Sequence, residues 1–118
     1  MLQVVTDEDS YKIAVEFVDG CDLSKRMDMK AISDSEGAHM MYQVLLGLEY
    51  LHEKNIVHRN ITTKSVVVMP VKCIGDPATV KVTDLSLASY FPHGEGLTRQ
   101  IGHVNYRAPE MIKNERYN

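Results

Sequence analysis

The arrangement of apolar and polar residues predicts one long helix near the middle of the chain. Ser33 and Glu36 have the spacing of a capping box, in which each side chain satisfies a free backbone N–H of the other residue. Beyond them, side chains recur at spacings of three and four, which is typical of an amphipathic helix. The recurring positions are Ala38, Met41, Leu45, Leu48 and His52, with Met40, Val44 and Leu51 widening the apolar face. We therefore expect a helix that ends near His52 and buries this face.

A run of β-branched and aromatic residues precedes the helix. It covers residues 11–18 and predicts a strand that is ended by Gly20. The next residues, 22–27, are expected to begin a short helix with Asp22 near its start. This part of the chain therefore reads as a strand, a turn and a helix start.

Two short apolar runs follow the long helix. They cover residues 66–69 and 79–83, and the turn-forming residues between them predict a hairpin with a long connection. The polar segment 55–65 lies between the helix and this hairpin, so we expect a surface loop, where chemistry tends to be found. After Asp84 the pattern is irregular until residues 108–112, which can start a helix because proline is tolerated in a first turn.

Composition narrows the class of protein only a little. The chain has 118 residues, of which 44% are hydrophobic and 25% charged, so it can form at most one small soluble domain. Thirteen Lys and Arg against sixteen Asp and Glu give a net charge of −3, which argues against a nucleic-acid-binding surface. No apolar run approaches the ~20 residues of a membrane span, and the N-terminus lacks the features of a secretory signal.

The cysteines and histidines add no metal site. Cys21 and Cys73 form no CxxC pair and match no zinc spacing. Their default state is the reduced thiol of an intracellular, cytoplasmic protein, although a pairing between them stays open. No two of the five histidines have a convincing ligand spacing.

Several motifs occur in one order along the chain. They are the helix segment Tyr42–His52, the loop His58-Arg59-Asn60, the segment Lys81–Ala88 and the stretch from Gly102 to Ala108-Pro109-Glu110. Their order and spacings resemble those of the central part of a protein kinase domain. The resemblance is closest to the calcium/calmodulin-dependent group of Ser/Thr kinases, and it covers essentially the whole chain.

The resemblance implies an α+β fold, mainly the upper part of a kinase C-terminal lobe with the hinge strand. Residues 1–23 would supply the strand and the hinge, and residues 24–118 the long helix, the catalytic-loop hairpin and the activation segment. The family's glycine-rich loop, its third-strand lysine and the helices after APE have no match here, so this would be under half of a kinase domain. A fragment of a longer product, a trimmed gene model and a short protein all stay open.

Three residues of the predicted catalytic loop depart from the kinase pattern. Asn60 replaces the Asp that orients the attacking hydroxyl and accepts its proton, and an amide has no useful basicity near neutral pH. Thr62 replaces the Lys that neutralises the transferring phosphoryl group. Ser65 replaces a metal-ligating Asn, and its hydroxyl is a poorer ligand for a hard cation. Because loss of a general base alone costs ~10²–10⁴ in rate, the resemblance predicts catalytic impairment.

Other family positions are retained. Asp84 keeps one strong carboxylate ligand for Mg²⁺, while Ser86 replaces a Gly, a change that some active relatives tolerate. Arg59 matches the residue that braces the activation segment, and Thr98 is the position best suited to phosphorylation there. A purely local role for both residues stays open. His58 is expected to pack beneath the loop.

The predicted hinge would contact a nucleotide. Val15 falls at the gatekeeper position, Glu16, Phe17 and Val18 match the backbone that pairs with adenine, and Asp22 matches the acidic residue near the ribose. A plain strand end and helix start is the alternative for these residues. ATP and Mg²⁺ are expected as weak or absent cofactors, because the phosphates would find few partners.

We therefore expect a protein-kinase-like module that is catalytically impaired. Such a pseudokinase would act by binding or allosteric regulation in signalling, and its partner would be a protein, either another kinase or a substrate protein. An active ATP-dependent Ser/Thr protein kinase with an atypical catalytic loop is the alternative. A remnant without function is the third possibility.

Overall fold

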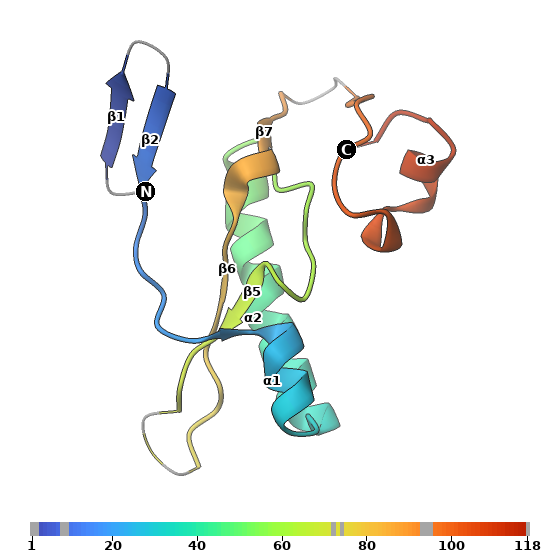
Figure 1. Cartoon of the computed structure of the whole chain (residues 1–118). Helices are drawn as coiled ribbons and strands as arrows, with labels where there is room; N and C mark the ends of the chain where they lie inside the picture. Colours follow the sequence, from blue (N-terminus) through green and yellow to red (C-terminus); the bar gives the residue numbers. More distant parts are fainter. Residues whose placement is uncertain (1–2, 8–9, 72, 74, 93–95, 118) are drawn as a thin grey trace.

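The computed structural model describes residues 3–7, 10–71, 73, 75–92 and 96–117. Its strands and helices form the predicted α+β architecture (Figure 1). In chain order they are β1 (Gln3–Asp7), β2 (Ser10–Ala14), β3 (Cys21–Asp22), α1 (Leu23–Met29), α2 (Asp34–Glu53), β4 (Ile56–Val57), β5 (Val66–Val68), β6 (Val80–Val82), β7 (Ser89–Tyr90) and α3 (Pro109–Ile112), with 3₁₀ turns at Leu85–Leu87 and Val104–Tyr106.

The helix α2 and the antiparallel sheet β3–β5–β6 form the only buried core cluster in the described part of the chain, named here the helix–sheet block. The predicted hairpin is confirmed: β5 pairs with β6 from Val66 opposite Val82 to Val68 opposite Val80. Apolar side chains from the sheet and from α2 meet between them. The buried residues are Met40, Val44, Val66, Val68, Ala78 and Val80.

The predicted bounds of the long helix are confirmed, and the predicted buried face is confirmed only in part. Met40 and Val44 are buried, whereas Met41 and Leu45 are each 55% exposed. Neighbouring residues of a helix point about 100° apart, so two adjacent apolar rows look alike in sequence. The sheet decides between them, because it packs on the row that contains Met40 and on Gly47, where an added Cβ would lie 3.5 Å from Val82.

A polar residue fixes this helix face against the sheet. Gln43 donates from Nε2 to the carbonyl of Ala78 at 2.8 Å and accepts at Oε1 from the Val80 N–H at 3.0 Å. The strand β6 is the outer strand of its sheet, so the amide satisfies backbone groups that no further strand pairs with. The helix is therefore hydrogen-bonded to the sheet as well as packed on it.

The helix starts have the predicted caps, with one difference. Ser33 Oγ accepts from the Glu36 N–H at 3.2 Å, and Asp22 caps α1 by accepting from the Lys25 N–H at 3.0 Å. The Glu36 carboxylate does not complete a capping box; it accepts a hydrogen bond from Arg26 at 2.6 Å instead. A guanidinium is a stronger partner for a carboxylate than a backbone N–H, and this ion pair joins α1 to α2.

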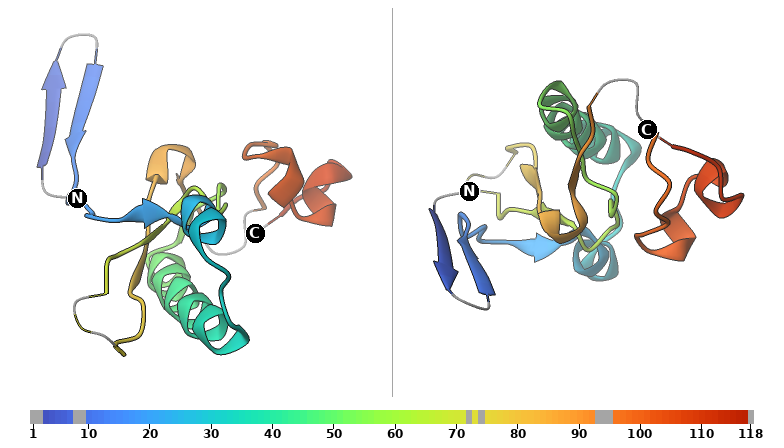
Figure 2. Two further views of the ribbon diagram at one scale, coloured as in Figure 1. Left: turned by 60° about the horizontal axis from the view of Figure 1, so that its bottom comes forward. Right: turned by 90° about the horizontal axis from the view of Figure 1, so that it is seen from above.

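The strand predicted for residues 11–18 is shorter and lies apart from the block. It is β2, which ends at Ala14, opposite Gln3 of β1. A strand needs a paired neighbour, and beyond this pair residues 15–19 are in no strand. Every residue of β1 and β2 is exposed, and the hairpin projects from the block in each view (Figure 1 and Figure 2).

The segment after Asp84 has more order than its sequence pattern indicates. Its strand β7 pairs antiparallel with β4, so the predicted loop 55–65 begins with a short strand. Leu97 and Tyr117 exchange two backbone hydrogen bonds of 2.8 and 2.9 Å, which close the C-terminal segment around α3. The predicted helix start at residues 108–112 is confirmed as α3, with Pro109 in its first turn.

The molecule has an open shape. Its radius of gyration is 16.2 Å, compared with about 13–14 Å for a compact chain of this length. Its accessible surface is 8967 Å², compared with about 6,500 Å² for a compact monomer of this mass. Large apolar side chains are part of this exposed surface, and on the outer face of α2 they are Met41, Tyr42, Leu45, Leu46 and Tyr50.

Candidate functional site

The predicted catalytic loop is anchored from below by His58. This side chain is only 2% exposed, so the expectation that it packs beneath the loop is confirmed. Its Nδ1 accepts from the Asn60 N–H at 3.3 Å, and its Nε2 lies 2.9 Å from the carbonyl of Thr83. A backbone N–H can only donate and a carbonyl can only accept, so the proton is on Nε2. The imidazole therefore bridges the loop and the end of β6.

Thr62 and Ser65 form a closed turn within this loop. The Ser65 hydroxyl accepts from the Thr62 N–H at 2.9 Å and donates to the Thr62 carbonyl at 3.1 Å. Ser65 is 2% exposed, so its hydroxyl lies inside the turn. The Thr62 hydroxyl accepts from the Lys64 N–H at 3.1 Å. Both side chains are thus hydrogen-bonded to the loop's own backbone.

Arg59 connects the loop to the segment after Asp84. Its backbone is left-handed, with φ of 63°, and its Nε donates to the carbonyl of Leu87 at 2.7 Å. This is the local backbone contact that the sequence left as an alternative to a phosphate contact. Thr98 is exposed, next to the paired residue Leu97. Its phosphorylation stays a prediction.

The end of the predicted activation segment packs directly on the predicted catalytic loop at Gly102. Its φ is +91°, and an added Cβ would lie 2.3 Å from the Arg59 carbonyl oxygen, so only glycine fits this approach. Arg107 fixes the same turn by donating from Nε and Nη2 to the Gly102 carbonyl at 3.1 and 3.0 Å. Thr63 and Tyr106 add a hydroxyl contact of 3.2 Å.

Asn60 and Asp84 come together in the structure, and Ser86 joins them. Ser86 Oγ donates to Asp84 Oδ1 at 2.6 Å, and Asn60 Nδ2 lies 3.4 Å from Asp84 Oδ2. The Ser86 hydroxyl holds the pKa of Asp84 below its usual range, with a smaller lowering from the Asn60 amide, while partial burial acts in the opposite direction. We call these three residues the Asp84 cluster.

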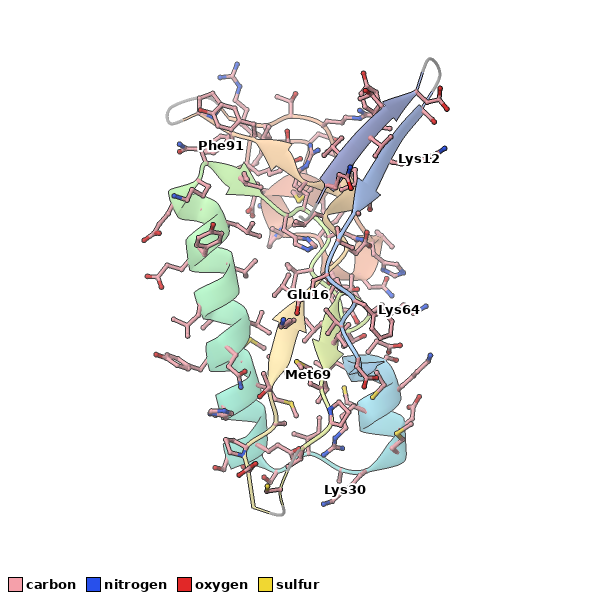
Figure 3. The ribbon with its side chains drawn as sticks, turned by 90° about the vertical axis from the view of Figure 1, so that its left-hand side faces the viewer. Lys12, Glu16, Lys30, Lys64, Met69 and Phe91 are labelled. Carbon is pink, nitrogen blue, oxygen red and sulfur yellow. The ribbon has the colours of Figure 1, made fainter. Side chains whose placement is uncertain are left out.

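The predicted hinge residues lie on the surface between the N-terminal hairpin and the block. Val15 and Phe17 are exposed, Phe17 at 86%, and Val18 is half-buried. Glu16 forms an ion pair with Lys81 of β6, which lowers the pKa of Glu16 below its ordinary value (Figure 3). Asp22 serves as the cap of α1 and lies 3.7 Å from Lys25 Nζ. In the described part of the chain no hydrogen bond joins these residues to the Asp84 cluster.

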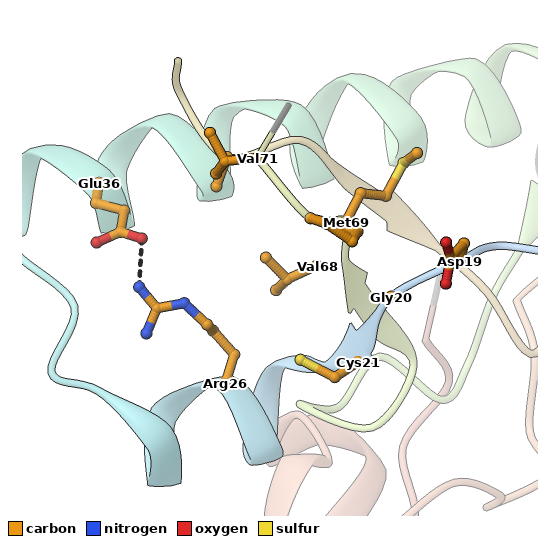
Figure 4. A pocket seen from close by; sticks show the side chains of 10 residues that line it. Asp19, Gly20, Cys21, Arg26, Glu36, Val68, Met69 and Val71 are labelled. Atoms are coloured by element: carbon orange, nitrogen blue, oxygen red, sulfur yellow. Dashed lines mark hydrogen bonds and ion pairs between the residues drawn. The ribbon is translucent and has the colours of Figure 1, made fainter. Parts of the chain in front are cut away.

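A cavity lies away from the Asp84 cluster, between α1, the start of α2 and the end of β5. It has a volume of about 380 Å³ and none of the predicted catalytic residues line it. Figure 4 shows the Arg26–Glu36 ion pair on one side and Val68, Met69 and Cys21 on the other. Both cysteines are free thiols, Cys21 half-buried and Cys73 exposed.

A comparison with protein families identifies the chain. The model of the protein kinase domain family matches residues 1–118. The chain belongs to the protein kinase domain family. The motifs at His58-Arg59-Asn60, Lys81–Ala88 and Ala108-Pro109-Glu110 predicted a kinase-like α+β fold. This prediction is confirmed.

Three similar proteins are protein kinases of fungi. An Aurora kinase of Eremothecium gossypii is 29% identical over 113 residues, covering 95% of this chain and 29% of that protein. The SNF1-like protein kinase ssp2 of Schizosaccharomyces pombe is 26% identical over 117 residues, covering 99% and 19%. The serine/threonine-protein kinase RAD53 of Saccharomyces cerevisiae is 32% identical over 111 residues, covering 91% and 13%. The chain therefore spans less than a third of the length of these curated relatives.

Neither a membrane-spanning helix nor a metal-binding group of side chains occurs among the described residues. No helix in the described ranges is long and apolar enough to cross a membrane. No group of three or more His, Cys, Asp and Glu among these residues could hold a metal ion.

Sequence reasoning missed two contributors to the site. The first is Ser86, which the sequence presents only as a tolerated replacement of Gly. In the structure it makes the shortest contact to Asp84. A signal was present, because a Ser two residues after an Asp is well placed for a local side-chain hydrogen bond. The second is Lys81, which the sequence shows only as part of the segment Lys81–Ala88. Nothing in the sequence pattern pairs it with Glu16, 65 residues away.

Proposed function

We propose that this kinase family member is a pseudokinase, a catalytically impaired module that acts by binding. The observation that carries the proposal is Asn60, which stands where the family has its catalytic base and directs its amide at Asp84. Nδ2 donates one N–H to that carboxylate, and the only atom of Asn60 that could accept the proton of a substrate hydroxyl is the weakly basic amide oxygen. Asn60 can orient a hydroxyl, but it cannot remove the proton.

A second departure acts on the same step. Thr62 carries no charge, and its hydroxyl is engaged with the Lys64 N–H, so it cannot neutralise a transferring phosphoryl group. Penalties on one shared step are not additive. Loss of the base alone would bring a typical kinase turnover of ~1–100 s⁻¹ down by ~10²–10⁴, so we expect a rate below about 1 s⁻¹.

The binding role that we propose has a protein as its partner, either another kinase or a substrate protein. The exposed apolar side chains of α2 and of the hinge give such a partner a surface to cover. ATP would bind weakly, through the hinge backbone at Glu16, Phe17 and Val18. A signalling role of this kind places the protein inside the cell, and membership of the calcium/calmodulin-dependent group stays a prediction.

The test is a radiolabelled phosphotransfer assay with ATP and a general kinase substrate. It is run on the longest natural polypeptide that contains these 118 residues, as the wild type and as Asp84→Ala. We expect wild-type turnover indistinguishable from that of the variant. Turnover above about 1 s⁻¹ that Asp84→Ala abolishes would overturn the proposal.

An active kinase with unorthodox chemistry is the second candidate. It is favoured by the approach of Asn60 to Asp84 and by the bond from Arg59 to Leu87, which together keep the loop assembled. The variant Asn60→Asp separates the two candidates. A high rate that this variant leaves unchanged supports unorthodox activity, and absence of turnover in both forms supports the binding role.

A further inference from the structure

The chemistry of the kinase family implies Mg²⁺, so the residues at its two expected ligand positions can be tested against a divalent cation. Ser65, at the first position, does not fit. Its hydroxyl is buried, accepts one backbone hydrogen bond and donates another, both within the turn 62–65. An oxygen that ligates a cation must direct a free lone pair at the ion, and reaching outward would break this turn.

Asp84, at the second position, has both carboxylate oxygens engaged. The 2.6 Å contact from Ser86 to Oδ1 lies in the range of strong hydrogen bonds from a hydroxyl to an ionised oxygen. The 3.4 Å contact from Asn60 to Oδ2 is longer and weaker.

The two substitutions therefore complement each other. The family pattern has Asp at position 60 and Gly at position 86, so it has a second negative charge here and lacks the donors of both Asn60 and Ser86, and a cation would stabilise the two carboxylates. Here Asn60 removes one negative charge and adds an N–H donor, and Ser86 adds an O–H donor. The positive ends of these two donor dipoles therefore take the place of the positive charge that a cation would provide.

We infer that Ser86 and Asn60 satisfy Asp84 in place of a divalent cation, so that this site does not bind Mg²⁺. Mg²⁺ demands near-octahedral oxygen ligands and is usually held by one or two carboxylates together with substrate phosphates. A single carboxylate already engaged by two donors offers less than this. The inference deepens the proposed function, since it concerns the same site, but it makes a separate claim about metal binding.

The test measures binding of Mn²⁺ alone, as MnCl₂, by electron paramagnetic resonance of the free ion. The proteins are the wild type, Asp84→Ala and the double variant Asn60→Asp/Ser86→Ala. We expect the wild type to bind Mn²⁺ no more tightly than Asp84→Ala. The double variant restores a second carboxylate and frees Oδ1, so we expect its affinity to rise by about tenfold or more.

A matched control adds the same charge and removes a hydroxyl elsewhere. Asn105→Asp/Ser89→Ala does this at an exposed turn residue and a half-buried strand residue, and we expect Mn²⁺ affinity like that of the wild type. The inference is overturned if the wild type binds Mn²⁺ about tenfold more tightly than Asp84→Ala, or if the double variant binds no more tightly than the control.

A second measurement needs no double variant. The carboxylate ¹³C shift of Asp84 in the wild type should not change on addition of MgCl₂, and a saturable change there overturns the inference. The outcome is separate from that of the phosphotransfer assay. Metal binding without turnover would reject this inference and keep the pseudokinase proposal, whereas metal-independent turnover would do the reverse.

Discussion

The helix–sheet block and the N-terminal hairpin use the same residue type in strands with opposite results. Val66 and Val68 of β5 are 4% and 5% exposed, whereas Val4 and Val5 of β1 are 46% and 47% exposed. Val66 and Val68 lie in one buried cluster with Met40 and Val44 of α2, while the valines of β1 lie on a hairpin whose strands contact mainly each other. The difference teaches that β-propensity and turn geometry suffice to pair two strands, but that a two-stranded sheet gains little stability without a packed face.

The first way to break the comparison is to remove buried volume from the block. Met40→Ala should lower the free energy of unfolding by about 2–5 kcal/mol, because it deletes a core side chain and leaves a cavity. Met41→Ala is the matched control on the same helix, since this neighbour is 55% exposed, and it should change stability by less than about 0.5 kcal/mol. Urea unfolding followed by circular dichroism measures both, and equal losses would mean that α2 presents a different face to the sheet.

The second prediction places one substitution in each region. Val68→Ala removes a side chain packed on α2 and should cost about 1.5–3 kcal/mol in the same urea experiment. Val4→Ala makes the same chemical change on the exposed hairpin, and its cost should be within about 0.5 kcal/mol. A cost at Val4 comparable to that at Val68 would show that the hairpin is packed in solution, and the contrast drawn above would fail.

The third prediction concerns the polar link within the block. Gln43→Ala removes the partner of the Val80 N–H and of the Ala78 carbonyl, and loss of these bonds at a part-buried site should cost about 1–2 kcal/mol. Amide hydrogen exchange gives a more specific signal, because the Val80 N–H should lose protection while interior amides of α2 keep theirs. Uniform loss of protection throughout the block would instead point to a general loss of stability.

These contrasts also show what the sequence could and could not predict about the fold. The start of α2 was predicted because Ser33 caps it locally, and the β5–β6 hairpin because its residues are adjacent in the chain. The sequence could not predict which apolar row of α2 is buried. Met40 and Met41 belong to equally apolar rows, and only the sheet distinguishes them. The two-residue strands β4 and β7 were not predicted. Each exists only because it pairs with the other, and the paired residues are 32 or more positions apart in the sequence.

The site divides in the same way. The family motifs marked Asn60 and Asp84 as candidate site residues without predicting their contact, whereas the anchoring of His58 beneath the loop was expected from the resemblance. The contact of Ser86 with Asp84 depends on the left-handed backbone of Asp84, whose φ is 61°, and no periodic pattern encodes that. Ser65 was expected as a weak ligand by its position alone, whereas the turn that buries its hydroxyl became visible only in three dimensions.

The smallest effect is expected where the two regions are tied together, at the Glu16–Lys81 ion pair. The hydrogen bond from Lys81 lowers the pKa of Glu16 in the folded protein, so the pair stabilises the hinge above the pKa that Glu16 has in the unfolded chain. That contribution disappears as the pH falls through the lowered pKa, when the carboxylate takes up its proton. Because the pair is exposed, salt should weaken it and the stability of the whole chain should hardly change.

Lys81→Met tests this tie directly. A ¹³C pH titration should place the Glu16 midpoint below the ordinary range for Glu in the wild type and return it towards that range in the variant. Amides of residues 15–19 should exchange faster in Lys81→Met, while the urea midpoint stays nearly constant. Lys12→Met, which removes an exposed lysine from β2 (Figure 3), is the matched control and should leave the Glu16 titration as it is. A Glu16 midpoint that Lys81→Met does not move would mean that the hinge is not tied to β6 in solution, and the hairpin would then be connected to the block by the chain alone.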